Sequence, residues 1–182
     1  MSLFAPLPLP IRIALAPKNW PLIAAGVSLA LLAGAFAFEY IGGLAPCPMC
    51  VTQRWAHAAI AGAGLTVFLA LRLAPLPDLS ARLGVGLVGA LSLVSLWHAT
   101  HHVLVEYGVL DLPPSCAGVT GGPVSLAQLD ALLDTARTIP LCNEIAWSLF
   151  GVSMAGWNAL VSLGLVAISF LILADAMRRP RP

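Results

Sequence analysis

The stretch APCPMCVTQR (residues 45–54) places two cysteines, Cys47 and Cys50, and one arginine, Arg54, between two long apolar runs. A charged side chain is costly inside a bilayer, so an arginine four residues after a cysteine requires a reason. The apolar runs themselves decide the fold class. With 59% hydrophobic and 9% charged residues, where soluble domains have roughly a quarter charged, the chain has the composition of an integral membrane protein.

Four stretches are long enough to cross a hydrocarbon core of roughly 30 Å, which takes about 20 helical residues. They cover about residues 20–38, 51–71, 83–105 and 145–174. We therefore expect a single integral membrane domain over residues 1–182. It should be an all-α, four-transmembrane-helix bundle with outer loops at 39–50 and 106–144.

The charges predict how this bundle is oriented. Four spans place both termini on one side, and seven of the nine basic residues fall there: Arg12, Lys18, Arg72, Arg82, Arg178, Arg179 and Arg181. Because positive charge marks the cytoplasmic side, we expect cytoplasmic termini and cysteines in or beside the outward loops, which in bacteria face an oxidising compartment. The first apolar run is longer than the core of a signal peptide and is expected to be retained.

The second outer loop contains a helical pattern. SLAQLDALLDTAR (residues 125–137) has leucines on one face and charges on the other, and Ser125 with Gln128 fits a capping box. We expect a short amphipathic helix that lies on the membrane surface or packs on the loop itself. Cys116 and Cys142 flank this segment, so a disulfide between them would close the loop.

The CxxC pair admits several interpretations. Haem attachment requires a histidine after the second cysteine, where this chain has Val51. Structural zinc usually requires a second close pair or closely spaced histidines, and Cys116 and Cys142 do not provide that spacing, so no metal site is predicted. An inert structural disulfide and a redox-active pair remain.

Arg54 favours the redox interpretation. Cys50 is expected at the start of the second span, where the helix dipole favours a thiolate, and Arg54 follows it on the same helical face. His57 continues that face. The hypothesis gives Arg54 an anionic partner, either this thiolate or an electron-accepting oxygen. The alternative is an arginine that only anchors the helix at the membrane surface.

Three histidines lie at a similar depth near the outer end of the third span. His98, His101 and His102 share one helical face, and with Arg54 they could line a pocket in the outer leaflet that Trp147 walls. Ordinary hydrogen bonding between helices is the alternative for these histidines. The spacing of His98 and His102 also suits a metal or a haem.

The CxxC at the start of the second of four spans, the arginine after it and a cysteine pair in a long outer loop resemble the disulfide-bond-formation protein B (DsbB) family. The specific part is CPMCVTQR (residues 47–54) with Cys116 and Cys142, within a resemblance that extends over about residues 20–175. EIAWSL (residues 144–149) looks like the family's entry into the fourth span. Pro48 and Met49 replace the family's larger aliphatic residues, and Gln53 stands where some members have an acid.

The resemblance implies a relay of electrons. A reduced periplasmic DsbA-like thioredoxin-fold protein attacks the loop disulfide at Cys116, and Cys142 then exchanges with Cys47. Cys50 passes the electrons to a bound quinone, ubiquinone or menaquinone, whose oxygen Arg54 holds. The residues expected at the quinone are Arg54, Cys50, His57, His98, His101, His102 and Trp147. The chain is thus expected to be a protein-dithiol:quinone oxidoreductase of the bacterial inner membrane.

Other functions stay open at this point. A non-catalytic four-helix membrane protein could use two disulfides only to brace its outer loops, and a b-type haem protein could use the histidines of the third span. A vitamin K epoxide reductase-like enzyme is a variant of the first hypothesis, although a CxxC that opens the second of four spans suits the DsbB pattern better. Membrane lipid is an expected partner, and nucleic acid is not, because the chain has no large basic cluster.

Overall fold

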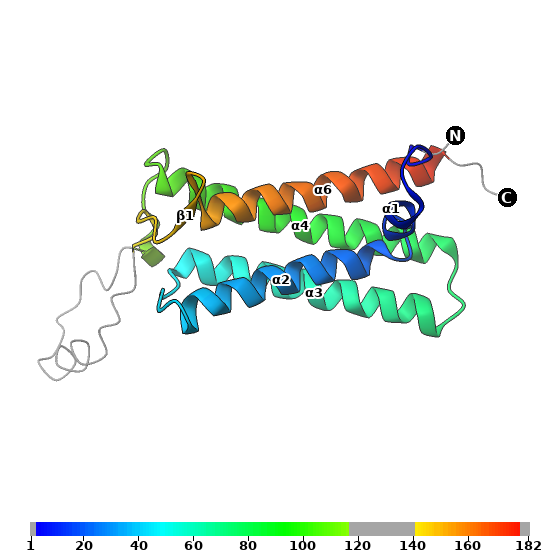
Figure 1. Cartoon of the computed structure of the whole chain (residues 1–182), viewed down its shortest axis with the longest axis horizontal. Helices are drawn as coiled ribbons and strands as arrows, with labels where there is room; N and C mark the ends of the chain where they lie inside the picture. Colours follow the sequence, from blue (N-terminus) through cyan, green and yellow to red (C-terminus); the bar gives the residue numbers. More distant parts are fainter. Residues whose placement is uncertain (1–2, 117–140, 179–182) are drawn as a thin grey trace, which may run out of the picture.

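The computed structural model describes residues 3–116 and 141–178 and shows four long helices side by side (Figure 1). The elements are α1 (Leu9–Ala14), α2 (Trp20–Tyr40), α3 (Pro48–Leu73), α4 (Asp78–Glu106), the 3₁₀ turn η1 (Pro114–Cys116), the strands β1 (Ser148–Leu149) and β2 (Val152–Ser153), and α6 (Met154–Arg178). By length and apolar composition, α2, α3, α4 and α6 can each cross a membrane. The expected all-α bundle of four transmembrane helices is therefore confirmed.

Two helix pairs make the most extensive contacts, α4 with α6 and α2 with α3, and contacts between α3 and α4 join them. Their buried apolar side chains form one core: Trp20, Ala24, Ile60, Val85, Val88, Leu165 and Ile172. A Cβ atom at Gly64 of α3 would lie 2.4 Å from the carbonyl oxygen of Pro21 on α2. The two backbones therefore approach as closely as small residues allow, which is how helices pack in lipid.

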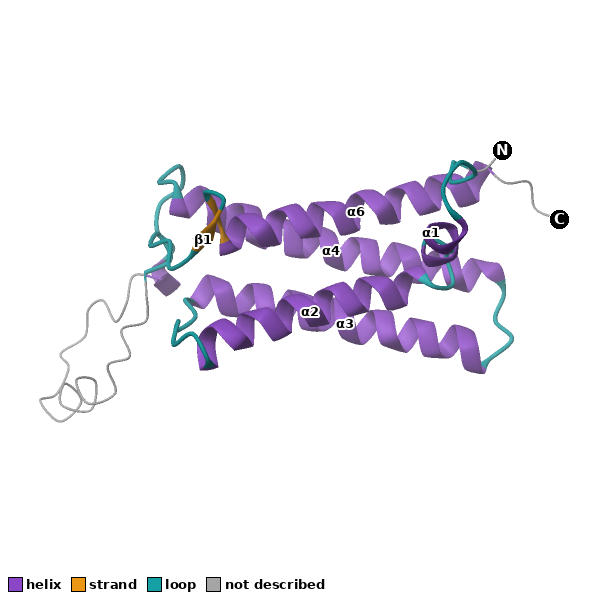
Figure 2. Cartoon of the chain, viewed as in Figure 1, coloured by secondary structure: helices purple, strands orange, loops and turns teal. Residues whose placement is uncertain are grey.

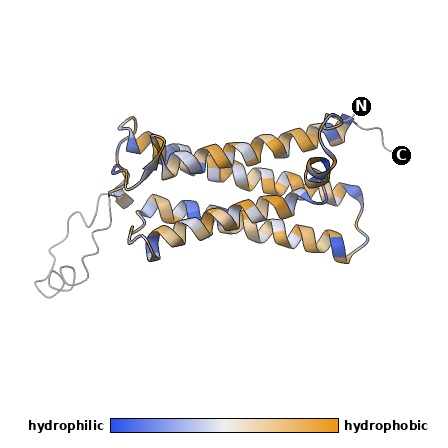
Figure 3. Cartoon of the chain, in the orientation of Figure 1, coloured by the Kyte–Doolittle hydropathy of each residue, from blue (hydrophilic) through white to orange (hydrophobic). Residues whose placement is uncertain are grey.

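The outward surface of the bundle is also apolar. Figure 3 shows hydrophobic residues along the helices and hydrophilic residues mainly near the two ends. On α4, the large side chains of Leu93, Val94 and Trp97 are all at least half exposed. An apolar surface this extended fits contact with lipid chains rather than with water.

Both termini lie at one end of the bundle, and the loops that follow α2 and α4 lie at the other (Figure 1). At the terminal end, four basic residues line one cavity: Arg12, Lys18, Arg72 and Arg82. At the loop end, the last turns of α2 and α4 carry Glu39 and Glu106. This separation of charge is the one expected from the sequence.

The start of the last span differs from the expectation. The sequence predicts a helix from residue 145, but α6 begins only at Met154, after the antiparallel hairpin of β1 and β2 (Figure 2). Phe150 and Gly151, at φ 52° and 78°, turn this hairpin. Two successive positive φ angles are typical of a type I′ turn. The hydroxyl of Ser153 then accepts the amide hydrogen of Gly156 at 3.1 Å and caps the helix.

The other boundaries are close to those expected. α3 begins at Pro48 rather than residue 51, and α4 begins at Asp78 rather than residue 83. The amphipathic helix expected at 125–137 lies outside the described residues and stays a prediction.

The close approach of α2 and α3 can be tested at Gly64. Gly64→Ala is expected to lower the free energy of unfolding by about 1–3 kcal/mol, the usual cost of an overpacked contact, because the new methyl group would collide with the backbone of Pro21. Gly62→Ala on the same helix is the matched control, since a Cβ atom there meets nothing within 4 Å. Thermal unfolding in detergent compares the two, and equal melting temperatures would contradict the close packing.

Candidate functional site

Cys47 and Cys50 lie where α3 begins, at the loop end of the bundle. Cys47 is the N-cap of α3, and its sulfur accepts the amide hydrogen of Cys50 at 3.2 Å. Pro48 follows at the first helical position, where a missing amide hydrogen costs nothing. This local geometry turns both sulfurs to the same side, with Cys47 Sγ and Cys50 Sγ 2.7 Å apart. Both are free cysteines.

The second cysteine pair is closed. Cys116, at the end of η1, forms a disulfide with Cys142, and their Cα atoms are 5.7 Å apart. This is one of three connectivities that the sequence leaves open. Both residues are buried, at 3% and 0% exposed.

The two pairs are neighbours in space. Cys47, Cys116 and Cys142 form one buried cluster with Val105, and Cys50 packs against it. Cys47 is 3% exposed, while Cys50 is half-buried. Cys116 and Cys142 are far from Cys47 in the sequence. The fold nevertheless brings their disulfide into the same cluster as the CxxC pair.

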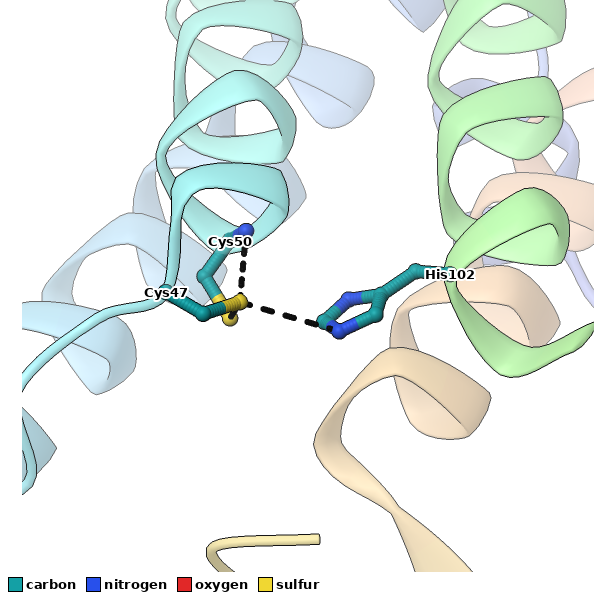
Figure 4. Close-up of side chains that lie close together, drawn as sticks. All are labelled: Cys47, Cys50 and His102. Atoms are coloured by element: carbon teal, nitrogen blue, oxygen red, sulfur yellow. Dashed lines mark hydrogen bonds between the residues drawn. The ribbon is translucent and has the colours of Figure 1, made fainter. Parts of the chain in front are cut away.

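His102 of α4 faces the CxxC pair from across the bundle (Figure 4). Its Nε2 atom lies 3.7 Å from Cys47 Sγ, and its Nδ1 atom is 2.8 Å from Gln53 Nε2. The ring also interacts with the backbone of Cys142. His102 therefore borders both cysteine pairs.

The electrostatics of the site act most clearly on Cys47, which lies just outside the span of α3. The hydrogen bond with Cys50, together with the nearby His102 ring, lowers the pKa of Cys47 below its usual value, although burial acts in the opposite direction. These contacts favour the thiolate form of Cys47. The sequence predicts the thiolate on Cys50 instead; in the structure, the hydrogen-bond donors converge on Cys47.

Arg54 has a carboxylate partner. Its guanidinium forms an ion pair with Glu39 of α2, donates to the carbonyl oxygen of Ala35 at 3.1 Å, and lies 4.9 Å from the ring centre of Phe36. The side chains of Arg54 and Glu39 are only 17% and 16% exposed. The sequence predicts a sulfur or a quinone oxygen as the anionic partner. The structure shows Glu39 in that place.

Trp147 packs against α2. Its ring is 4.9 Å from the ring of Phe38 on α2, one residue before Glu39. Because α6 starts later than expected, Trp147 belongs to the segment before the hairpin and not to a helix. One aromatic ring, that of Phe36, thus lies against Arg54, and Trp147 contacts the same helix, α2, at Phe38.

The histidines do not gather around Arg54. His102 faces the sulfurs, and His57 is buried between helices, where Asn158 Oδ1 lies 2.6 Å from its Nε2 and Ser28 Oγ lies 3.2 Å from its Nδ1. His98 and His101 are half-buried. Within the described ranges, no hydrogen bond joins any of these four histidines to Arg54.

A chain of amides connects His57 with His102. Asn158 Nδ2 donates to Gln53 Oε1 at 2.5 Å, and Gln53 Nε2 reaches His102 Nδ1. The sequence alone does not identify Asn158 as a functional residue. Gln53 stands out only because some members of the family have an acidic residue at that position. The available signal was a pair of amide side chains inside apolar spans, where unpaired polar groups are costly.

Cys47, Cys50 and His102 also offer three ligand atoms within 4.8 Å of one another. The spacing of Cys116 and Cys142 in the sequence argues against a zinc site. In the structure, however, His102 could complete such a site with Cys47 and Cys50. The hydrogen bond from Gln53 to Nδ1 favours a different role. It leaves the proton of the neutral ring on Nε2, so that this atom donates toward sulfur and does not coordinate a metal.

Comparison with known proteins assigns the family. The family model described as Disulfide bond formation protein DsbB matches residues 17–172. Disulfide bond formation protein B of Methylococcus capsulatus is 33% identical over 154 residues, covering 82% of this chain and 89% of that protein. Disulfide bond formation protein B 2 of Pseudomonas aeruginosa is 31% identical over 155 residues, covering 85% and 86%. With four spans and two cysteine pairs at one end, the chain belongs to the DsbB family of disulfide bond formation proteins.

Proposed function

We propose that this chain is a membrane thiol oxidase that reoxidises a periplasmic DsbA-like dithiol protein and passes the electrons to a quinone. One observation carries the proposal. The disulfide Cys116–Cys142 and the free pair Cys47 and Cys50 share one buried cluster, so electrons can move between them by thiol–disulfide exchange.

The relay begins at the loop disulfide. A thiolate of the partner attacks Cys116, which forms a mixed disulfide and releases Cys142 as a thiolate. The second partner thiol then attacks the mixed disulfide, so that the partner leaves oxidised and Cys116 and Cys142 remain as a dithiol. Because Cys116 is buried, this step requires that the approach of the partner uncovers it.

The second exchange joins the two pairs of this chain. The Cys142 thiolate attacks Cys47 of a Cys47–Cys50 disulfide and releases Cys50. Cys116 then attacks Cys142, which restores the loop disulfide and releases Cys47. Two electrons have moved from the loop pair to the CxxC pair, and the result has the pairing seen in the structure.

A quinone would supply the final two-electron acceptor. The side chains near Arg54 fit such a group, because a cation beside the aromatic ring of Phe36 suits a flat ring with a polar oxygen. Arginine has five N–H donors, and Glu39 and Ala35 engage only part of the set. Arg54, Cys50 and Trp147 are the residues we propose to hold it, with His98 and His101 as further candidates. His57 and His102 already have other partners.

The charges support the proposed location. Basic residues collect at the terminal end of the bundle and the cysteines at the other end. We place the termini in the cytoplasm and the cysteines on the periplasmic side of a bacterial inner membrane.

The two alternatives are less well supported. Disulfides that only brace the loops do not explain a free CxxC pair packed against a closed disulfide. A haem held by His98 and His102 would require a ring nitrogen of His102, and both nitrogens already face Gln53 and Cys47.

Electron transfer to quinone is expected to stop in Cys50→Ser, because Cys47 alone cannot form the CxxC disulfide. The assay mixes purified protein with a reduced DsbA-like partner and ubiquinone or menaquinone and follows the absorbance of the oxidised quinone. Met49→Leu, inside the same motif, is the control and should stay active. Undiminished quinone reduction in Cys50→Ser, or none with the wild type, would refute the proposed function.

Arg54→Gln is expected to raise the KM for quinone by about tenfold or more, the effect of losing one charged hydrogen bond, while thiol exchange at Cys116 continues. Glu39→Gln is the matched control, because it breaks the same ion pair and keeps the guanidinium. If both variants have the same KM for quinone, Arg54 serves only as the partner of Glu39.

A further inference from the structure

His102 is placed at the junction of the two cysteine pairs. In Figure 4, its ring extends from α4 toward the start of α3, with Nε2 directed at Cys47. The side chain is 4% exposed, so water does not compete effectively for this contact. The backbone of Cys142 lies against the same ring. A group in this position can act on Cys47 during exchange with Cys142.

The proton of the neutral His102 ring has a defined position. Asn158 Nδ2 donates to Gln53 Oε1 at 2.5 Å, which fixes the orientation of the Gln53 amide. The Gln53 Nε2 atom therefore points at His102 Nδ1, 2.8 Å away, and can only donate to it. Nδ1 is then the acceptor, and Nε2 carries the hydrogen toward Cys47.

The orientation of Asn158 is fixed in turn. Its Oδ1 atom lies 2.6 Å from Nε2 of His57 and accepts from the hydroxyl of Ser162 at 3.3 Å. The Nδ1 atom of His57 is 3.2 Å from Ser28 Oγ. Four helices thus contribute to one directed series of hydrogen bonds that ends at Cys47.

We propose that His102 is a catalytic residue of the exchange between the two cysteine pairs, donating a hydrogen bond from Nε2 to Cys47, and that Gln53 and Asn158 are positioning residues that hold it in this tautomer. The proposal rests on the relay of the previous section. It assigns His102 a role in thiol–disulfide exchange and not in binding the quinone.

The step that His102 assists is the release of Cys47. The Cys116 thiolate attacks Cys142 in a Cys142–Cys47 mixed disulfide, the bond between Cys142 and Cys47 breaks, and its electron pair stays on Cys47. A new bond joins Cys116 to Cys142. One thiolate enters and one leaves, so no net proton is needed. The Nε2 hydrogen stabilises the departing charge, and a better-stabilised leaving thiolate leaves faster.

The other groups around Cys47 fit this role. The Cys50 thiol approaches from α3, and Glu106 Oε1 of α4 lies 3.9 Å from His102 Nε2. Ser153, from the hairpin before α6, donates to Glu106 Oε2 at 2.5 Å. This hydrogen bond holds Glu106 beside His102. A negative carboxylate there strengthens the His102 ring as a hydrogen-bond donor, and so supports its bond to the Cys47 thiolate.

The experiment is a titration of the Cys47 thiolate in the full chain with the loop disulfide closed and the CxxC pair reduced. Ultraviolet absorbance of the thiolate is followed against pH, with Cys47→Ser subtracted as the blank. In His102→Phe the midpoint should rise by about one to two pH units, the size expected when a charged group loses one hydrogen bond. Trp97→Phe, on the exposed face of the same helix, is the matched control and should not shift it.

A second variant tests the positioning residues. It also keeps the proposal testable if His102→Phe does not fold. Gln53→Met keeps the His102 ring and removes only the donor to Nδ1, so the midpoint should move upward by a smaller amount. The single-turnover rate of exchange between the two pairs should fall in both variants, with the Trp97→Phe rate unchanged.

Two results would overturn the proposal. One is a His102→Phe midpoint and exchange rate equal to those of Trp97→Phe, and the other is a Gln53→Met midpoint equal to that of the wild type. The titration needs no partner and no quinone, so its outcome is independent of the proposed function. A failure of the relay appears instead as absent quinone reduction by the wild type.

Discussion

The site depends on the stabilisation of negative charge on Cys47 by protein groups. A thiolate at the edge of a bilayer has few water molecules to solvate it, so protein donors must do so. The amide of Cys50, the Cys50 thiol and the His102 ring supply them, two from the first turn of α3 and one from α4. This is why the CxxC must open a helix and why α4 must pack beside α3 at this end. The same donors leave Cys47 as the reactive sulfur that meets the loop disulfide.

Polar groups in the interior of the bundle are likewise stabilised by protein partners. Among the described residues, every buried side-chain nitrogen and oxygen has a hydrogen-bond partner. His57, Gln53 and Asn158 satisfy one another between α3 and α6, and Arg54 and Glu39 neutralise each other between α3 and α2. In lipid such pairs add to close packing as the forces that hold helices together. Chemistry and stability therefore draw on the same polar residues.

The sequence predicts the parts of this protein that depend on local pattern. Four apolar runs set the four spans, and Cys47-Pro48-Met49-Cys50 sets the start of α3. It does not predict contacts between helices. Glu39, the partner of Arg54, lies 15 residues earlier on another helix, and Asn158, the partner of Gln53, lies 105 residues later. The sequence also does not predict where α6 begins. The turn at Phe150 and Gly151 lies inside an apolar run whose composition is typical of a helix.

The central claim is that Cys47 and Cys142 exchange directly. The most direct measurement uses the variant Cys50→Ser with Cys116→Ser, which leaves only those two cysteines, oxidised in the membrane and digested for mass spectrometry. The account predicts a Cys47–Cys142 disulfide in most of the protein, and much less cross-linking between Cys50 and Cys142 in the matched variant Cys47→Ser with Cys116→Ser. If Cys47 and Cys142 remain free thiols, or if Cys50 pairs with Cys142 equally well, the two pairs do not meet as described.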